Sequence, residues 1–482
     1  MPHPRVTLAA TDATIPGGVL AALRDRFAAV RAELGLSLDY PADALAEAQQ
    51  VAAPPLDLPP LDETDLPFFT IDPPGSMDLD QAMHLEREGE GHRVRYAIAD
   101  VPSFVRLGGA LDRVTRERGQ TVYCPDVRVP LHPEVLSEAA ASLLPDAVRP
   151  AFVWDLHLDH AGLLTSAEVH RAMIRSVARL DYATVQAALD AGTDDERFLL
   201  LREVGERRIE QERARGGASL PMPEQQVTAT GGGGFTLEFR PPVLAEDWNA
   251  QISLLTGMAA ASMMLDAGVG VLRTMPAPTP DAVARFRRAA RGLGVDWPEG
   301  VSYGDLVRGL DRTDPRHLAL IHEATSLFRG AGYTAFDGQA PAEREHAAVA
   351  APYAHVTAPL RRLVDRFGLV VCEAVSQGRE VPDAVRAALP LVPALMQESD
   401  RKARAAERAC ADATEAAVLS GREGEVFRAV VVDHTDKGME VQLVDLPVLT
   451  RVTGDRAPLG GEVSTRLESA DVKAGTAVLV RV

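Results

Sequence analysis

The chain has 482 residues, of which 46% are hydrophobic and 25% are charged, and its formal net charge is −19. The length implies two or three domains, and the composition is that of a globular protein with a sizeable core. The acidic balance excludes a protein whose whole surface is coated by nucleic acid, although it leaves room for a local basic channel.

The cysteines and the apolar runs indicate the compartment. Cys124, Cys372 and Cys410 are far apart and have no metal-ligand spacing, so we expect neither a disulfide framework nor a zinc site, and a reducing cytosol fits. The N-terminus has no leader pattern, and the longest apolar-rich run, Ser253 to Leu265, is too short to span a bilayer. We therefore expect a cytoplasmic monomer with no membrane partner.

Residues 1–60 are predicted to form a small helical module. Helical periodicity runs from Val19 to Leu34 and from Ala42 to Val51, and a proline-rich linker follows at 51–67. Two interpretations are open for this module. It is either a helix-turn-helix that contacts RNA or a helical brace on the main domain.

The stretch FFTIDPPGSMDLDQ, residues 68–81, carries the most chemistry. A short buried strand is followed by a Pro-Pro-Gly turn, which can fold Asp72 back toward Asp78 and Asp80. Asp78 and Asp80 share one face of an extended segment. Converging carboxylates repel one another unless a cation lies between them, and oxygen-only ligands suit Mg²⁺ or Mn²⁺. The alternative interpretation is an acidic surface loop that caps a strand.

The remainder of the main body, residues 61–419, is predicted to be a mixed sheet followed by helices, an α+β arrangement. Strands are expected at 94–100, 151–158 and 167–173, with an extended segment at 121–131 and a hairpin around the glycines at 231–234. Helices are expected at 110–118, 181–216, 245–267, 280–293, 303–311, 314–330, 359–377, 382–397 and 399–419. The sequence thus predicts that 244–419 is almost entirely helical.

Residues 420–482 form a third predicted unit. Short alternating strands with glycine turns over about sixty residues are typical of a five-stranded OB barrel. Such barrels bind single-stranded nucleic acid through a basic groove and stacked aromatic rings.

Two neighbouring segments of the main body resemble the sequence of a known protein family. IDPPGSMDLDQAM, followed by YAIADV at Tyr96 to Val101, resembles the catalytic signature of the ribonuclease II (RNB) family of exoribonucleases. The resemblance implies that Asp72, Asp78 and Asp80 occupy the first three acidic positions of that signature. Gln81 stands where the family has a fourth aspartate, so a metal ligand without charge is expected there. Residues 61–419 are then the RNB catalytic domain, and 420–482 resemble the RNA-binding barrel named from a ribosomal protein.

A second signature, YAHVTAPLRRLVD at Tyr353 to Asp365, is similar to another stretch of this family. The resemblance implies that Arg361 is the catalytic arginine and that Thr357 and Arg362 lie along the RNA. A helix beginning at Pro359 would place its first turn near the site, where helix N-termini and guanidinium groups both favour phosphate oxygens. On the residues alone, the arginine pair is a solvated pair on a helix.

A third match, SDRKARAAERACAD at 399–412, implies that Glu407 lies near the leaving nucleotide and that Arg404 binds RNA. On the residues alone, this is a solvated helix. Tyr123 falls on the family's tyrosine that stacks on the terminal base, and a strand tyrosine in the core is the alternative. The family's partner aromatic residue is missing near 217–226, where Leu220 is the nearest candidate.

The resemblance implies a processive, hydrolytic 3′→5′ exoribonuclease that releases nucleoside 5′-monophosphates from single-stranded RNA. Mg²⁺, for which Mn²⁺ could substitute, would be held by the aspartates and Gln81. Asp80, Arg361 and Glu407 would act on the terminal phosphodiester. The alternative function is that of a catalytically weak RNA-binding or regulatory relative of the family.

Overall fold

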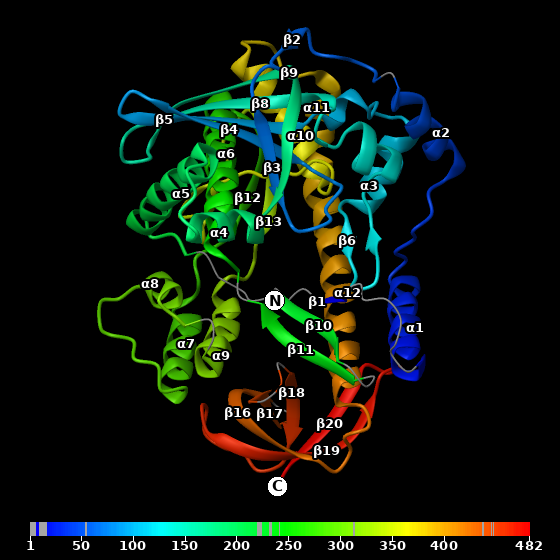
Figure 1. Cartoon of the computed structure of the whole chain (residues 1–482), viewed down its shortest axis with the longest axis vertical. Helices are drawn as coiled ribbons and strands as arrows, with labels where there is room; N and C mark the ends of the chain where they lie inside the picture. The colour runs from blue at the N-terminus through cyan, green and yellow to red at the C-terminus, as the bar shows by residue number, and fades with distance from the viewer. Residues whose placement is uncertain are drawn as a thin grey trace.

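A computed structural model describes residues 6–8, 17–53, 55–218, 224–230, 234–240, 242–311, 314–435, 438–444, 446 and 448–482. Figure 1 shows a mixed sheet with its helices at one end of the molecule and a small barrel at the other. The predicted α+β class is therefore confirmed.

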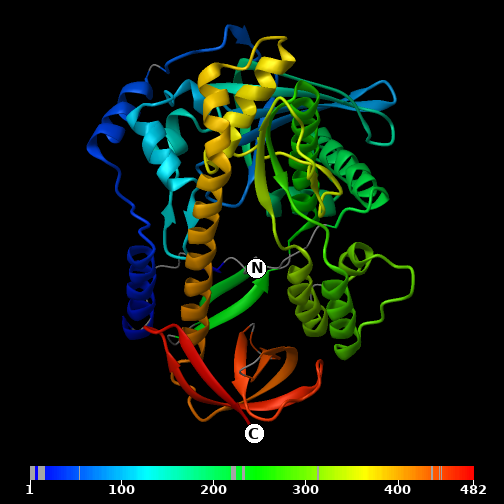
Figure 2. The ribbon, with the colours of Figure 1, turned by 180° about the vertical axis from the view of Figure 1, so that it is seen from behind.

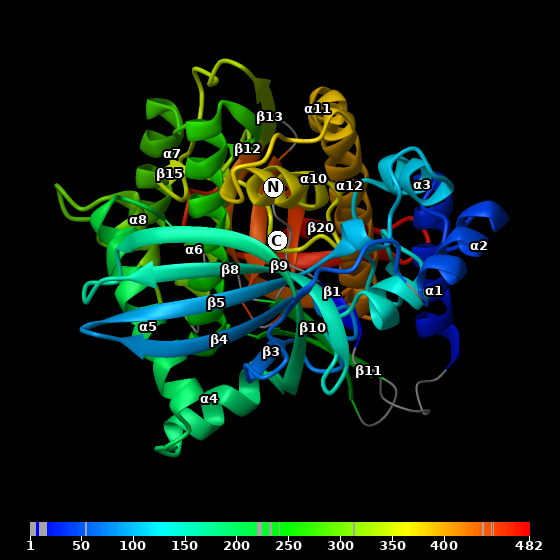
Figure 3. The same cartoon turned by 90° about the horizontal axis from the view of Figure 1, so that it is seen from above.

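The central sheet has six strands in the order β2-β9-β3-β4-β5-β8. The strands are β2 (Leu61–Asp62), β3 (Phe68–Asp72), β4 (Gln81–Glu88), β5 (Gly91–Ala99), β8 (Val148–Leu158) and β9 (Leu164–Asp181). The long strand β9 pairs in parallel with β3 and antiparallel with β8, so the pairings run in a ring. Figure 3 shows β4, β5 and β8 side by side.

Helices cover both faces of this sheet. Neighbouring strand residues point to opposite faces. Tyr96 accordingly belongs to a core shared with α6 (Leu244–Ala267) and α10 (Leu363–Ser376), whereas Ala97 packs in a second core with α2 (Ala42–Val51) and α3 (Ala110–Arg118). Both faces are buried, which explains the run of apolar residues at the end of β5.

The remaining elements surround this body. The further helices are α1 (Gly17–Glu33), α4 (Tyr182–Asp190), α5 (Glu196–Ala214), α7 (Pro280–Gly292), α8 (Tyr303–Arg308), α9 (Pro315–Ala324), α11 (Asp383–Ala388) and α12 (Val392–Leu419). The short strands are β1 (Val6–Leu8), β6 (Val122–Tyr123), β7 (Arg128–Val129), β10 (Glu224–Thr230), β11 (Gly234–Arg240), β12 (Val269–Thr274), β13 (Gly332–Asp337), β14 (Glu345–His346) and β15 (Ala351–Pro352).

Helix α12 connects the two ends of the molecule. Figure 2 shows it running from the main body down to the barrel, with α1 alongside. The barrel is closed in the order β16-β17-β18-β20-β19, as an OB-type unit requires. Its strands are β16 (Val426–Thr435), β17 (Gly438–Leu443), β18 (Leu449–Thr453), β19 (Glu462–Asp471) and β20 (Thr476–Arg481).

The two predicted N-terminal helices form, but they pack on different partners. Leu23, Phe27 and Val30 of α1 lie in an apolar cluster with α12. Helix α2 instead packs against α3. Each helix therefore buries its apolar face against the main body.

Three expectations for 244–419 are wrong. The antiparallel pair β12 and β13 lies within the stretch expected to be helical. Helix α10 begins at Leu363 and not at Pro359. The break expected near residue 398 is absent, because α12 is continuous from Val392 to Leu419. Among the described residues, no helix combines the length and the apolar character needed to cross a bilayer.

Candidate active site

The sequence candidates gather around one large cavity. Its volume is about 1210 Å³. The predicted residues that line it are Asp72, Asp78, Asp80, Gln81, Tyr123, Thr357, Arg361, Arg362 and Glu407. Residues separated by more than 300 positions in the sequence therefore share one site.

A tight turn sets the first carboxylates in place. Asp72 is the last residue of β3, and the turn after it includes a hydrogen bond from the Ser76 amide to the Pro73 carbonyl of 3.1 Å. Gly75 has a φ of 81°, a left-handed conformation that glycine adopts at little cost. The chain thereby reverses and carries Asp78 and Asp80 to the start of β4.

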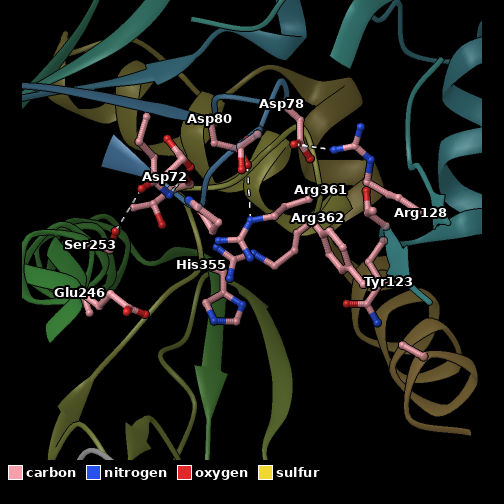
Figure 4. Close-up of a pocket in the computed structure, with 18 of the residues that line it drawn as sticks. Asp72, Asp78, Asp80, Tyr123, Arg128, Glu246, Ser253, His355, Arg361 and Arg362 are labelled. Carbon is pink, nitrogen blue, oxygen red and sulfur yellow. Dashed lines mark hydrogen bonds and ion pairs between the residues drawn. The ribbon is translucent and has the colours of Figure 1, made fainter. Parts of the chain in front are cut away.

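Asp80 lies at the centre of the site and is 4% exposed. Its Oδ1 accepts a hydrogen bond of 2.7 Å from the Leu360 amide, and its Oδ2 lies 3.4 Å from Nε of Arg361. Figure 4 shows Arg361 reaching up to this carboxylate. Burial raises the pKa of Asp80 well above its usual range, and Arg361 opposes that rise. The ion pair with Arg361 therefore offsets only part of the effect of burial on the pKa of Asp80.

The other two aspartates differ in their surroundings. Burial raises the pKa of Asp72 to about 7, an effect that Arg361 opposes and Asp78 reinforces. The Asp78 carboxylate forms an ion pair with Arg128, since its Oδ1 lies 2.5 Å from Nη1 of Arg128 (Figure 4). Arg128 is shared, since it also pairs with Glu138.

These carboxylates are the candidate ligands for a metal ion. Within the described part of the chain, no group of three or more His, Cys, Asp or Glu side chains is arranged to hold one. The three aspartates do not converge as the sequence suggested, since Asp78 is engaged by Arg128. Asp72 and Asp80 nevertheless fit a hard cation, because they supply oxygen donors and because a cation would oppose the effect of burial, which raises the pKa of both carboxylates despite Arg361.

Both ends of the Gln81 amide are engaged by protein groups. Nε2 donates to the Thr357 carbonyl at 2.6 Å, and Oε1 accepts from the Tyr96 hydroxyl at 2.5 Å. The hydroxyl of Ser253 lies 3.5 Å from the same oxygen. The atom that could ligate a metal thus already accepts a hydrogen bond, and Gln81 ties β4 to the segment that precedes Arg361.

Arg361 lies in a turn and not in the first turn of a helix. Its carbonyl accepts a hydrogen bond of 2.9 Å from the Thr121 amide, which links the turn to the segment leading into β6. Gln120 makes an isolated bridge to Arg362 and donates to Asp400 of α12 at 3.0 Å. The turn is therefore fixed by backbone bonds on both sides.

Arg362 and Arg404 have ion-pair partners of their own. Arg362 makes two hydrogen bonds to Asp365, of 2.9 and 2.8 Å, and its side chain is partly buried. This pairing differs from the solvated pair that the residues alone suggested. Arg404 is not among the residues that line the cavity, and its nearest carboxylate, on Asp400, is 3.8 Å away.

Tyr123 and Glu407 face the cavity from neighbouring elements. Tyr123 is 38% exposed, and β6 packs against α12, which carries Glu407. The exposure argues against the alternative of a core tyrosine. Leu220 lies outside the described residues.

Several lining residues were missed by the sequence reasoning. Arg128 lies opposite Tyr123 in the β6–β7 hairpin, and that register could have been read from the two short extended runs. Asn249 and Ser253 are polar residues four apart in the apolar helix α6, a spacing that marks one helix face. His355 lies within the second signature, although no role was assigned to it from the sequence. Burial lowers the pKa of His355 well below its usual range, so the ring is neutral.

The fold and the site define an α+β domain with a large polar cavity, joined to an OB-type barrel. Residues 61–372 match the RNB domain, and 425–482 match the RNase II-type exonuclease C-terminal S1 domain. The first match covers more than half of the chain, so the protein belongs to the RNB family.

Named relatives support this assignment. The chain is 29% identical over 424 residues to ribonuclease R of Escherichia coli K12, a match that covers 80% of this chain and 50% of that protein. It is 30% identical over 319 residues to exosome complex exonuclease RRP44 homolog A of Arabidopsis thaliana, covering 62% and 33%. The chain thus spans about half the length of the Escherichia coli protein and about a third of the length of the Arabidopsis protein.

Solved structures share the fold. Mycoplasma genitalium RNase R in complex with ribose-methylated single-stranded RNA superposes with a TM-score of 0.82 at 17% identity, covering 96% of this chain and 78% of that one. Yeast Ssd1, described as a pseudonuclease, gives a TM-score of 0.65 at 18% identity, covering 86% and 53%. The fold is therefore shared by a protein named as a ribonuclease and by one described as a pseudonuclease.

Proposed function

We propose that this protein is a hydrolytic 3′→5′ exoribonuclease that degrades single-stranded RNA processively to nucleoside 5′-monophosphates. The observation that carries the proposal is the contact between Asp80 and Arg361 in a cavity that Tyr123 and Glu407 also line. A buried carboxylate beside a guanidinium, with an exposed ring nearby, suits a phosphodiester whose terminal base stacks on an aromatic residue.

Each side chain has a distinct task in this proposal. Arg361 neutralises the charge that develops on the phosphate oxygens during attack. Tyr123 seats the terminal base, and Glu407 positions the last nucleotide. Thr357 holds the turn in place through its carbonyl, which accepts from Gln81 at 2.6 Å.

Asp72 and Asp80 would hold Mg²⁺, or Mn²⁺ in its place, and Asp78 would join them if the cation displaced Arg128. When bound, the cation supplies an activated water and charge neutralisation. The oxygen-only donor set supports this choice of metal over a softer one. Gln81 is proposed as a positioning residue and not as a ligand, because its Oε1 accepts from Tyr96.

The three segments of the chain have different roles in this proposal. Residues 61–419 form the catalytic unit and 420–482 the RNA-binding barrel. Residues 1–60 brace the catalytic unit, since α1 packs on α12 and α2 on α3. The protein would act as a monomer in the cytoplasm.

A degradation assay tests the proposal. RNA labelled at its 5′ end is incubated with the protein and Mg²⁺, beside the Asp80→Asn variant and a matched DNA oligonucleotide. We expect shortening to a small end product with RNA and wild-type protein only. No shortening of RNA in Mg²⁺ or Mn²⁺ would overturn the proposal.

A second candidate function is RNA binding without efficient catalysis. Gln81 favours it, because the family has an aspartate at this position and the amide is already bonded at both ends. In the same assay, this function predicts tight RNA binding with no shortening by wild type. Intact binding therefore separates the second candidate from a misfolded sample.

A further inference from the structure

Two cysteines lie in the wall of the cavity. Cys124 directly follows Tyr123, and Cys410 lies on α12, three residues after Glu407. Both line the cavity. Two thiols from segments 286 positions apart in the sequence thus flank the residues proposed to seat the RNA end.

The surrounding packing fixes both thiols. Cys124 and Cys410 are 9% and 1% exposed and belong to the apolar cluster that joins α1 to α12. The Cys124 amide donates to the Val127 carbonyl at 3.0 Å, which closes a tight turn between β6 and β7. The Cys124 sulfur is therefore presented to α12 by a hairpin with little freedom.

The two thiols influence each other's ionisation. The interaction between them lowers the pKa of Cys124 and raises the pKa of Cys410, so Cys124 is the sulfur that ionises first. Arg31 of α1 adds to the lowering at Cys124 while its guanidinium pairs with Asp126 at 2.7 Å. Thiols with more thiolate character and a positively charged neighbour react faster with oxidants.

We propose that Cys124 and Cys410 form a reversible disulfide in response to a hydroperoxide, and that this bond switches the RNA site off. The basis is that both side chains line the same cavity and belong to the same apolar cluster, at the place where β6 packs against α12. Disulfides in reducing compartments are commonly transient and redox-sensing. The regulatory part of this inference rests on the proposed exoribonuclease function, whereas formation of the bond does not.

The chemistry balances with hydrogen peroxide as the oxidant. The Cys124 sulfur attacks one peroxide oxygen, the O–O bond breaks, and the leaving hydroxide takes up a proton as water. Cys124 is now a sulfenic acid. The Cys410 sulfur then attacks the Cys124 sulfur, the S–O bond breaks, and a second water leaves with the Cys410 proton.

The bond would displace the neighbouring side chains. Sulfurs in a disulfide lie about 2.05 Å apart, closer than any two thiols that are not bonded, so the β6–β7 hairpin must move toward α12. Tyr123 moves with Cys124 because the two residues are adjacent. Misplacement of a substrate-seating group by about 1 Å can cost on the order of 10²-fold in rate.

Mass spectrometry tests the bond itself. The full-length reduced protein is treated with hydrogen peroxide, its free thiols are alkylated after denaturation, and its peptides are mapped without reduction. We expect a Cys124–Cys410 cross-linked peptide, with Cys372 recovered as a free thiol. Cys372 is the internal control, since it is fully buried and its sulfur contacts the Ala260 carbonyl at 3.7 Å. Oxidation of Cys124 or Cys410 without a cross-link between them would overturn the proposal.

The switch is tested by RNA degradation before peroxide, after peroxide and after dithiothreitol. We expect oxidised wild type to lose at least about tenfold in rate and to regain it on reduction, whereas Cys410→Ala loses no activity to peroxide. A cross-linked protein with full activity would overturn the switch. Absence of activity in the reduced wild type would instead count against the exoribonuclease function. In that case the switch is tested by RNA affinity, which should fall when the two cysteines are cross-linked.

Discussion

The amide of Gln81 donates a hydrogen bond of 2.6 Å to the carbonyl of Thr357, 276 residues further along the chain. Its other end accepts from Tyr96 at 2.5 Å. An ionised aspartate cannot donate to a carbonyl. Glutamine therefore lacks the negative charge that could attract a metal ion, but it provides a fixed link between β4 and the Arg361 turn. This difference sets the first prediction.

Gln81→Asp should restore charge and lose the link. We expect a lower Mg²⁺ concentration for half-maximal activity, together with a loss of roughly 1–3 kcal/mol in stability, because the Thr357 carbonyl loses its donor. Metal titration and denaturant unfolding measure the two effects. Gln81→Ala is the matched control, with the same loss of stability and no gain at low Mg²⁺. An unchanged metal requirement in Gln81→Asp would show that charge at position 81 is unimportant.

Arg128 is predicted to compete with the cation for Asp78, since the two side chains lie 2.5 Å apart. Arg128→Ala should lower the half-maximal Mg²⁺ concentration by about three- to tenfold, which corresponds to roughly 1 kcal/mol. Glu138→Gln should have the opposite effect, because Arg128 would then pair with Asp78 alone. Shifts in the same direction for both variants would contradict this competition.

Arg361 is predicted to act on the chemical step. Arg361→Ala should reduce kcat by about 10²–10³-fold, the usual cost of removing one group that stabilises transition-state charge. Arg361→Lys should recover part of the loss, since it keeps the charge without the planar fork. Single-turnover rates at saturating enzyme separate this effect from RNA binding. A variant that changes only KM would assign Arg361 to binding.

Tyr123 is predicted to stack on the terminal base. Tyr123→Ala should weaken binding of the 3′-terminal nucleotide by roughly 1–3 kcal/mol, and Tyr123→Phe should retain most of it. RNA that ends in an abasic nucleotide provides the control, because it should bind wild type and Tyr123→Ala equally. If Tyr123→Ala still weakened binding of the abasic RNA, stacking would not be the cause.

Helix α1 is predicted to be a brace. Phe27 is fully buried in the cluster between α1 and α12, so Phe27→Ala should cost about 3–5 kcal/mol in stability. RNA affinity, measured where the variant is still folded, should not change. Deletion of residues 1–60 extends the test. A loss of RNA affinity without a loss of stability would favour the helix-turn-helix alternative.

The sequence was sufficient to predict the local elements and most of the site. Asp72, Asp80, Tyr123, Arg361 and Glu407 all line the cavity, as the resemblance to the RNB family implied, whereas the residues alone pointed only to the aspartates. The closed terminal barrel follows in the same way from alternating strands and glycine turns.

The differences arise from contacts between distant segments. Asp78 turns to Arg128 because the β6–β7 hairpin packs beside the aspartate turn, and no local pattern reports that. Strand β12 lies between helices and forms through its pairing with β13, some sixty residues away. Pro359 suggested a helix start, but residues 360–362 are instead held by the Asp80 carboxylate and the Thr121 amide.

The central claim is that the Asp80–Arg361 site hydrolyses the 3′-terminal phosphodiester of RNA. Its most direct test uses single-stranded RNA labelled on the 3′-terminal nucleotide, with chromatography of the products from the first turnover in Mg²⁺. The account predicts that the label appears at once as a nucleoside 5′-monophosphate with wild type and not with Asp80→Asn. Label that stays in oligonucleotides, or that is released equally by Asp80→Asn, would contradict it.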